Sequence, residues 1–183
     1  MNTRPVLELV DAGCPDRRAE WERAFYQGFA RATSNRLIRT LWLWNEAEAR
    51  LATRIPYGDQ LIYLSRDAGG AINSGVAVNV GMRHFQASAF GFAPAAGGPP
   101  ACEILVAFNL HGAAPNLHWR DLAFADLHAR GYRRAYLTAA DRVHRLWRRY
   151  GAEVLAETLV DGERRWFLGF ALGPSGMAGA ANL

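Results

Sequence analysis

The sequence predicts an α/β fold, and three observations support this prediction. Residues 117–153 read as helix, strand, helix and return strand, joined by very short connections. Valines alternate at Val76, Val78 and Val80, which is typical of a half-buried antiparallel strand. An apolar stripe at helical spacing occurs near the amino terminus, formed by Trp21, Ala24, Phe25, Gly28 and Phe29. We therefore expect a sheet that includes antiparallel strands, with helices packed against it.

The first part of the chain is expected to supply most of the strands. We predict a strand at 6–10, two helices over about 16–54, and strands at 60–66, 71–80 and 102–110. Residues 83–92 are predicted to be a hairpin partner of the strand at 71–80. Residues 93–100, APAAGGPP, show no periodicity and are predicted to be a loop.

The second predicted helix, which ends at Pro56, is apolar around much of its circumference. Leu41, Trp42, Leu43 and Trp44 are consecutive. One helix cannot bury all of these side chains against a single core. We therefore expect part of this surface to form a pocket wall or a subunit contact, such as that of a homodimer.

The later helices have recognisable ends. Asn116 can be the N-cap of a helix that runs from 117 to about 130, and Gly131 stands where a left-handed C-cap glycine is expected. A strand follows at 133–138. Asp141 is the next N-cap candidate, and its helix ends at Gly151, with an apolar stripe formed by Val143, Leu146, Trp147 and Tyr150.

Length and composition limit the class of protein. A chain of 183 residues with 50% apolar content is expected to form one domain over 1–172, followed by a flexible tail at 173–183. The amino terminus shows no signal pattern, so we expect a soluble cytoplasmic protein without membrane insertion. Cys14 and Cys102 give neither a disulfide framework nor a metal-ligand spacing, and we expect no metal.

The net charge of +4 has an unusual origin, because all 21 basic residues are arginine. Chemistry that forms a Schiff base with lysine is therefore excluded. Seven arginines lie between residues 130 and 149, and arginine binds phosphate and carboxylate in a bidentate fork. This cluster is either a solvated face in a protein whose genome favours arginine codons, or a contact for coenzyme A phosphates, an acidic carrier protein or RNA.

Two segments, HARGYRRAYLTA and RLWRRYGAEV, resemble the carboxy-terminal half of the GNAT acyltransferases. The resemblance extends over most of the chain to Leu172, with degenerate motifs. It implies a mixed, mostly antiparallel central sheet of six to seven strands with helices on both faces. It also implies that an acyl-CoA or other pantetheine thioester is a co-substrate and lies along the strand at 102–110, beside Leu105 and Val106, where this strand splays from its neighbour.

The same resemblance places the pyrophosphate-binding turn at 111–116. Backbone N–H groups and a helix N-terminus hold the diphosphate there, so we expect contacts from His111, Gly112, Ala113, Ala114 and Asn116. The turn departs from the family pattern. His111 replaces the usual Arg or Gln, Ala114 and Asn116 replace two glycines, and Pro115 removes one amide donor.

The catalytic candidates follow from the same comparison. Glu103 is a candidate general base for an attacking ammonium, and His111 could act as a base or donate to phosphate; His84 is a further candidate base. The tyrosine that protonates the leaving thiolate in many GNAT enzymes is here Trp147, which we expect in the core, and Tyr150 is its candidate substitute. Cys102 could be an acyl nucleophile, although a buried structural thiol is the commoner role.

The leading hypothesis is a divergent N-acyltransferase that moves an acyl group from coenzyme A or acyl carrier protein to a small-molecule amine. An aminoacyl-tRNA donor is an alternative, since such a donor would rely less on the altered turn. A second hypothesis is a catalytically silent GNAT-like domain that binds a ligand or protein, and a third is nucleic-acid binding by the arginines alone.

Overall fold

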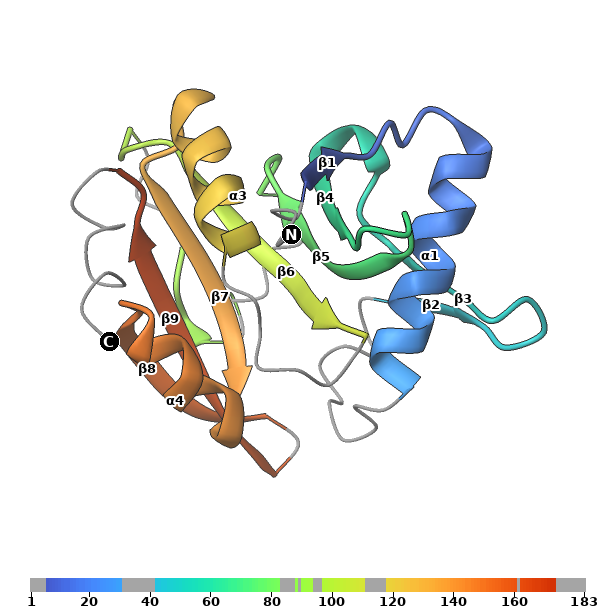
Figure 1. Cartoon of the computed structure of the whole chain (residues 1–183). Coiled ribbons are helices and arrows are strands. Elements are labelled where there is room, and N and C mark those ends of the chain that lie inside the picture. Colours follow the sequence, from blue (N-terminus) through green and yellow to red (C-terminus); the bar gives the residue numbers. More distant parts are fainter. Residues whose placement is uncertain are drawn as a thin grey trace.

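The computed structural model of the chain describes residues 6–30, 42–82, 88, 90–93, 97–110, 118–160 and 162–173. Within these residues, seven strands form one sheet in the order β1-β4-β5-β6-β7-β9-β8, and β2 and β3 form a separate pair (Figure 1). In the large sheet β6 and β7 are parallel, and the other neighbouring strands are antiparallel. The predicted mixed, mostly antiparallel sheet is therefore confirmed, with seven strands.

The element bounds agree with most of the sequence predictions to within two residues. The strands of the large sheet are β1 (Val6–Leu9), β4 (Gln60–Arg66), β5 (Ile72–Asn79), β6 (Ala101–Asn109), β7 (Arg134–Ala140), β8 (Glu153–Val160) and β9 (Glu163–Ala171). The α-helices are α1 (Pro15–Ala30), α3 (His118–Ala129) and α4 (Asp141–Arg149), and a 3-10 turn, η1, spans Tyr57–Asp59.

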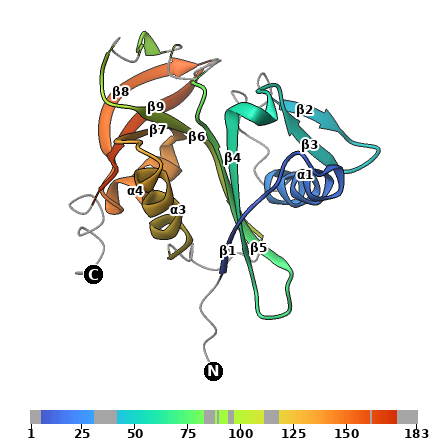
Figure 2. The ribbon, with the colours of Figure 1, turned by 90° about the horizontal axis from the view of Figure 1, so that it is seen from above.

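Helices cover both faces of the sheet, as predicted. On one face, α3 and α4 contribute Phe124, Leu127 and Trp147 to a core that contains Val78 and Ile104 of the sheet. On the other face, α1 packs Trp21, Phe25 and Phe29 against strand side chains that alternate with those of the first core. Figure 2 shows α1 and the helix pair α3 and α4 on opposite sides of the sheet. We call these sides the α1 face and the α3/α4 face.

The prediction of a second helix reaching about residue 54 was wrong. Trp42–Asn45 forms β2 and Arg50–Thr53 forms β3, which pair in antiparallel fashion from Trp42↔Thr53 to Asn45↔Arg50. Aromatic side chains such as those of Trp42 and Trp44 favour strands. The turn between β2 and β3 holds Ala49 in a left-handed conformation with φ of 49°. Leu43 and Trp44 are 48% and 36% exposed, which explains why the run appeared apolar on all sides. The part of the predicted helix before β2 lies mostly outside the described residues.

The ends of α3 and α4 follow the sequence closely. Gly131 has φ of 99° and is a left-handed glycine after a helix, as predicted. Gly151, where the next helix was predicted to end, is also left-handed, with φ of 89°. Two details differ for α4. Ala140, and not Asp141, is the N-cap, and the buried side includes His144, while Val143 is 43% exposed. The buried stripe therefore contains His144 in place of Val143 and keeps Leu146, Trp147 and Tyr150, which are buried or half-buried.

The predicted hairpin between 71–80 and 83–92 was also wrong. β5 is paired with β4 on one edge and with β6 on the other, so neither edge is free for a strand at 83–92. The alternation of valines identified the strand but carried no information on its neighbours. Residues 83–87 and 89, and the predicted tail beyond Gly173, lie outside the described residues.

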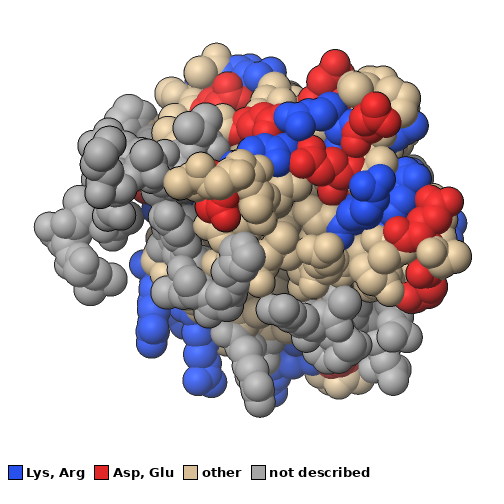
Figure 3. Space-filling model, turned by 45° about the vertical axis from the view of Figure 1, so that its right-hand side comes forward, with Lys and Arg blue, Asp and Glu red and all other residues tan. Residues whose placement is uncertain are grey.

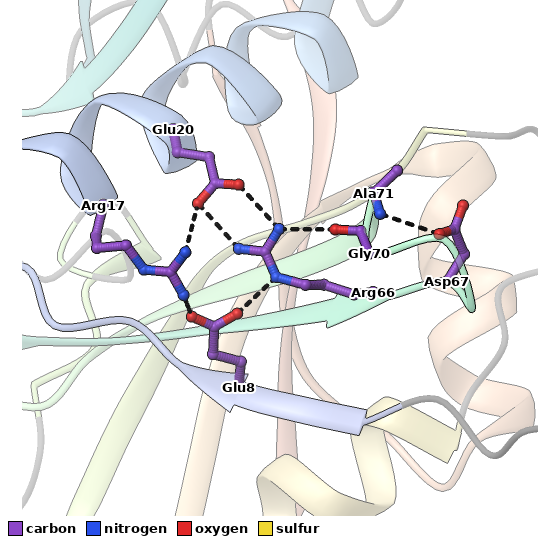
Figure 4. A network of polar contacts seen from close by, with 7 residues as sticks. All are labelled: Glu8, Arg17, Glu20, Arg66, Asp67, Gly70 and Ala71. Atoms are coloured by element: carbon purple, nitrogen blue, oxygen red, sulfur yellow. Dashed lines mark hydrogen bonds and ion pairs between the residues drawn. The ribbon is translucent and has the colours of Figure 1, made fainter.

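Ion pairs fix α1 to the edge of the sheet. Arg66 of β4 donates from Nη1 and Nη2 to the two carboxylate oxygens of Glu20 on α1, at 2.8 and 2.9 Å. Its Nε donates to Glu8 of β1 at 2.7 Å, and Arg17 of α1 pairs with both carboxylates (Figure 4). The bidentate geometry adds directional specificity to this contact between α1 and the sheet. On the side that carries α1, acidic and basic side chains are interspersed (Figure 3).

Candidate active site at the divergence of two strands

The parallel strands β6 and β7 separate partway along their length. Their ladder runs from Ala101↔Arg134 to Ile104↔Leu137 and does not extend to the remaining residues of either strand. Figure 1 shows the two arrows spreading apart beyond this point. The β7-facing edge of β6 from Leu105 onward is therefore outside the ladder. An extended ligand can hydrogen-bond to such an edge as an added strand does.

A β-bulge marks the same point of β6. Pairing with β5 changes from Ala77↔Val106 to Val78↔Ile104, so Leu105 is the extra residue. A bulge bends the strand and changes the direction of the following main-chain and side-chain groups. Leu105 and Val106, which were predicted to lie beside the thioester, are 7% and 5% exposed and pack in the α1-side core. Any contact that they make with a ligand would therefore come from the main chain.

Glu103 lies two residues before the bulge, on the α1 face. It is opposite Asn79 of β5 and Tyr136 of β7, and its side chain is 1% exposed. Asn79 Nδ2 donates a hydrogen bond to Glu103 Oε2 at 3.2 Å. A carboxylate held beside diverging strands is suited to accept a proton from a bound amine.

Cys102 is adjacent in sequence but points to the other face. Its side chain is fully buried in the α3/α4 core. Burial, together with the charge of Glu103, raises the pKa of the Cys102 thiol to about 12. A thiol with this pKa is a poor nucleophile at neutral pH. The structure thus favours the structural role of Cys102.

Trp147 and Tyr150 are both on the α3/α4 side of the sheet. Trp147 is 8% exposed and packs edge-on against Phe170, with ring centroids 5.8 Å apart, so it is a core residue as expected. Tyr150 follows the last turn of α4, and its ring faces the Arg120 guanidinium at 5.3 Å. Glu103 and Tyr150 therefore lie on opposite faces of the sheet, and the structure does not bring their side chains together.

The predicted pyrophosphate turn, with His111, Gly112, Ala113, Ala114 and Asn116, lies outside the described residues, and so does His84. The turn connects β6, which ends at Asn109, to α3, which begins at His118. Its position in the chain is therefore at the end of the diverging strand and before a helix N-terminus. The expected anion contacts at this turn stay predictions.

Arg120, in the first turn of α3, was not singled out from the sequence. It is 2% exposed, and its Nε donates to Asp121 Oδ1 at 2.9 Å while Nη1 donates to the Tyr150 carbonyl at 3.2 Å. Its guanidinium also lies over the Phe124 ring at 5.9 Å. These contacts join the start of α3 to the end of α4. Nothing in the local sequence separates this buried arginine from the exposed Arg145, Arg148 and Arg149 of α4.

An aromatic cluster extends the α1 face from Glu103 toward β9. Phe167 of β9 is fully buried and stacks with Tyr136 at 5.4 Å. Phe90 and Phe92 cover it, with centroid distances of 5.7 and 4.7 Å. Sequence reasoning did not find this cluster, because its members come from three separate segments. Alternation along β9 was the one signal that could have indicated Phe167 as an inward-facing residue.

The described residues contain no group of three or more His, Cys, Asp or Glu side chains arranged to hold a metal ion. Among the same residues, no helix is both long and apolar enough to cross a bilayer.

No family model matches the sequence, and neither does any curated protein. Solved structures do match it. TofI, in a ternary complex with an inhibitor and MTA, aligns with a TM-score of 0.72 and 16% identity over 97% of this chain and 96% of that one. BjaI, a CoA-dependent acyl-homoserine lactone synthase with SAM and isopentyl-CoA, aligns with a TM-score of 0.71 and 12% identity over 96% of this chain and 87% of that one.

A GNAT-family protein described as a putative acetyltransferase, from Desulfovibrio desulfuricans, aligns with a TM-score of 0.59 and 8% identity, covering 93% of this chain and 100% of that one. The fold is therefore that of the GNAT acyltransferases, which the acyl-homoserine lactone synthases share. At these identities the likeness shows the fold alone.

Proposed function

We propose that this protein is an N-acyltransferase that moves an acyl group from a pantetheine thioester to a small-molecule amine. The observation that carries the proposal is the divergence of β6 from β7 at a bulge, with the buried Glu103 carboxylate two residues before it. The pantetheine arm would lie along the open edge of β6 as an added strand. The location that goes with this proposal is the cytoplasm.

The chemistry needs little beyond positioning. The amine nitrogen forms a bond to the thioester carbonyl carbon, the C–S bond breaks, and the thiolate leaves. Glu103 would take the proton that the ammonium must lose before the attack. A main-chain N–H after the bulge would donate to the carbonyl oxygen as negative charge develops on it. Tyr150 stays the candidate acid that protonates the leaving thiolate. His111 stays an alternative candidate base for the attacking ammonium.

The arginines of α4 and the altered turn at 111–116 indicate which acyl donors to test. The exposed side chains of α4 include Arg145, Arg148 and Arg149, while His144 and Trp147 face the sheet. A basic outer helix suits coenzyme A phosphates, an acidic acyl carrier protein or a charged tRNA. The altered turn at 111–116 favours a donor held mainly by its pantetheine arm or by a protein contact. Because BjaI was solved with SAM and isopentyl-CoA, SAM is the first amine to test.

The test is a donor-by-acceptor matrix. Acetyl-, octanoyl- and palmitoyl-coenzyme A, the matching acyl carrier proteins and charged tRNA are each incubated with SAM and with a panel of primary amines. Free thiol is followed with a chromogenic reagent, and the products are identified by mass spectrometry. Amide formation that depends on Glu103 would support the proposal. Thermal stabilisation by donors without any amide would instead indicate a catalytically silent, ligand-binding domain.

A further inference from the structure

Arg165 of β9 is a buried arginine whose guanidinium is largely unpaired. Its side chain is 2% exposed. Neither Nε nor Nη1 has a hydrogen-bond acceptor within reach in the part of the chain that the structure describes. Its neighbour Arg164 shows the ordinary arrangement, since it is exposed and forms an ion pair with Glu157 at 3.1 Å.

This burial is costly for a permanently charged group. Desolvation lowers the pKa of Arg165, and the nearby charge of Glu163 offsets this only in part. A guanidinium nevertheless stays protonated in proteins, so it cannot escape the cost by losing its charge. An anion bound in a bidentate manner would restore the hydrogen bonds that water no longer supplies.

The register places Arg165 on the same face of the sheet as Glu103. Arg165 is opposite Ala140 of β7, and Phe167 is opposite Thr138. Phe167 stacks on Tyr136, which is opposite Glu103. Because side chains alternate along a strand, these residues form one continuous surface. Arg165 lies four residues further along β7 than Glu103, roughly 13 Å in the strand direction. It is thus at the end where β6 and β7 have separated.

We propose that Arg165 binds a carboxylate of the substrate that occupies the α1 face. This inference rests on the proposed acyl transfer and adds a substrate class to it. The carboxylate has two sources. It belongs either to the amine, as in an amino acid or SAM, or to the far end of a dicarboxylic acyl group. Both present the same planar anion to the guanidinium fork.

Matched substrate pairs distinguish the two sources. For the acyl group, succinyl- is compared with butyryl-coenzyme A and glutaryl- with valeryl-coenzyme A. For the amine, SAM is compared with decarboxylated SAM and methionine with methioninol. We expect at least a tenfold preference in kcat/KM for the carboxylate within one of the two sets, and the set that shows it identifies the source.

Arg165→Met should reduce that preference to less than threefold, whereas the matched control Arg164→Met, on the opposite face of β9, should retain it. A wild-type enzyme without preference in either set would overturn the proposal, as would an Arg165→Met variant that keeps the preference.

A binding measurement separates this proposal from the acyl-transfer proposal. Succinate, glutarate, methionine and SAM are each added alone, and the thermal midpoint of the protein is measured. At least one of them should raise the midpoint in the wild type and in Arg164→Met, and not in Arg165→Met. This result without turnover would support the anion site while the acyl-transfer proposal fails.

The free protein provides the last check. Arg165→Met should leave the unliganded midpoint unchanged or raise it, because an unpaired buried charge is removed. If the variant is less stable and no carboxylate shifts the wild type, Arg165 has a structural role only and the proposal is overturned.

Discussion

Cys102 and Glu103 show how strand alternation assigns different roles to adjacent residues. Cys102 packs under α3, whereas Glu103 faces the α1 side of the sheet next to Asn79. The sequence alone offered both as candidates for chemistry. Alternation places only Glu103 on the face that carries Tyr136 and Arg165, and this orientation determines the first two predictions.

Glu103→Gln should abolish most of the amide-forming activity. Glutamine keeps the shape of the side chain but cannot accept a proton from an ammonium at neutral pH. General-base catalysis of this kind contributes about 100- to 10,000-fold, so kcat/KM should fall by at least about 100-fold. The measurement is thiol release under saturating donor, together with circular dichroism to establish that the variant is folded.

Glu153→Gln is the matched control for Glu103→Gln. Its carboxylate is 65% exposed and lies 3.5 Å from Arg134, at the start of β8. An exposed pair of this kind contributes little to stability, so the control should retain full activity. Equal activity in both variants would remove Glu103 from the mechanism.

Cys102 should be inert toward thiol reagents in the folded protein. With a pKa of about 12, raised by burial and by the Glu103 charge, only about one thiol in ten thousand is ionised at pH 8. Cys14 is partly exposed and should account for all rapid labelling. Iodoacetamide labelling followed by mass spectrometry should give one modified cysteine in the native protein and two after denaturation. Rapid modification of Cys102 in native Cys14→Ser would contradict this assignment.

Among the elements, local signals predicted most of the sheet. The strands at 60–66, 71–80 and 102–110 and the glycines after α3 and α4 were found because alternation and C-capping are encoded within a few residues. The prediction of the second helix was wrong because the run from Leu41 to Trp44 fits either a helix or an exposed strand. Its pairing with β3 decides between them, and that pairing is not local.

The candidate site was only partly accessible from the sequence for the same reason. Glu103 could be identified from its place in one strand. Arg165 and Tyr136 join it only through the order β6-β7-β9, in which the last strand of the chain lies between two earlier ones. One sequence does not specify that order, and it does not show which of 21 arginines is buried without a partner.

The packing of α1 on β6 leads to a prediction about Gly28. A Cβ at Gly28 would lie 2.9 Å from Cβ, Cγ and Cδ2 of Phe108. Alanine would improve helix propensity by about 1 kcal/mol. Overpacking costs about 1–3 kcal/mol, and the close contact includes a Cβ that cannot rotate away. Gly28→Ala should therefore lower the free energy of unfolding, by about 1 kcal/mol net in urea titrations.

Two further variants test whether Phe108 is the cause. In a Phe108→Leu background, Gly28→Ala should be neutral or stabilising, because the clashing ring is gone. Gly58→Ala, where a Cβ meets no atom within 4 Å, should change stability by less than about 0.5 kcal/mol. A Gly28→Ala variant as stable as the wild type would mean that the helix can move away from β6 at little cost.

At the scale of the whole molecule, the sheet consists of two parts that meet at β6 and β7. The junction has four residue pairs, whereas β4 and β5 share seven. The part formed by β1, β4, β5 and β6 is held to α1 by the Arg66 network (Figure 4). The other part is held to α4 by the core around Trp147 and Phe170, and α3 packs across the junction, since the Tyr63 hydroxyl of β4 donates to Asp126 of α3 at 2.7 Å. Polar contacts and core packing thus stabilise the two parts around a junction that leaves room for an extended ligand.

These contacts predict how stability depends on pH. The hydrogen bond from Arg66 lowers the pKa of Glu20 below its ordinary value of 4.5, against an opposing effect of burial. Burial likewise tends to raise the pKa of Asp126, but hydrogen bonds from Tyr63 and Arg130 lower it below 3.8 overall. Both carboxylates bind protons more weakly when folded, so the stability that they contribute is present above their unfolded pKa values and is lost as the pH falls through the folded ones.

The urea midpoint should therefore begin to fall near pH 4.5 and continue to fall below pH 3.8. Glu20→Gln and Asp126→Asn should each be less stable at pH 7 and show a shallower decline in acid, because each removes one group whose proton binding is linked to unfolding. Arg66→Met alone should remove the contribution of Glu20 to the acid dependence of stability, since Arg66 is the main partner of Glu20. If the urea midpoints of Glu20→Gln and Asp126→Asn fall with decreasing pH as steeply as that of the wild type, neither contact links protonation to the stability of the fold.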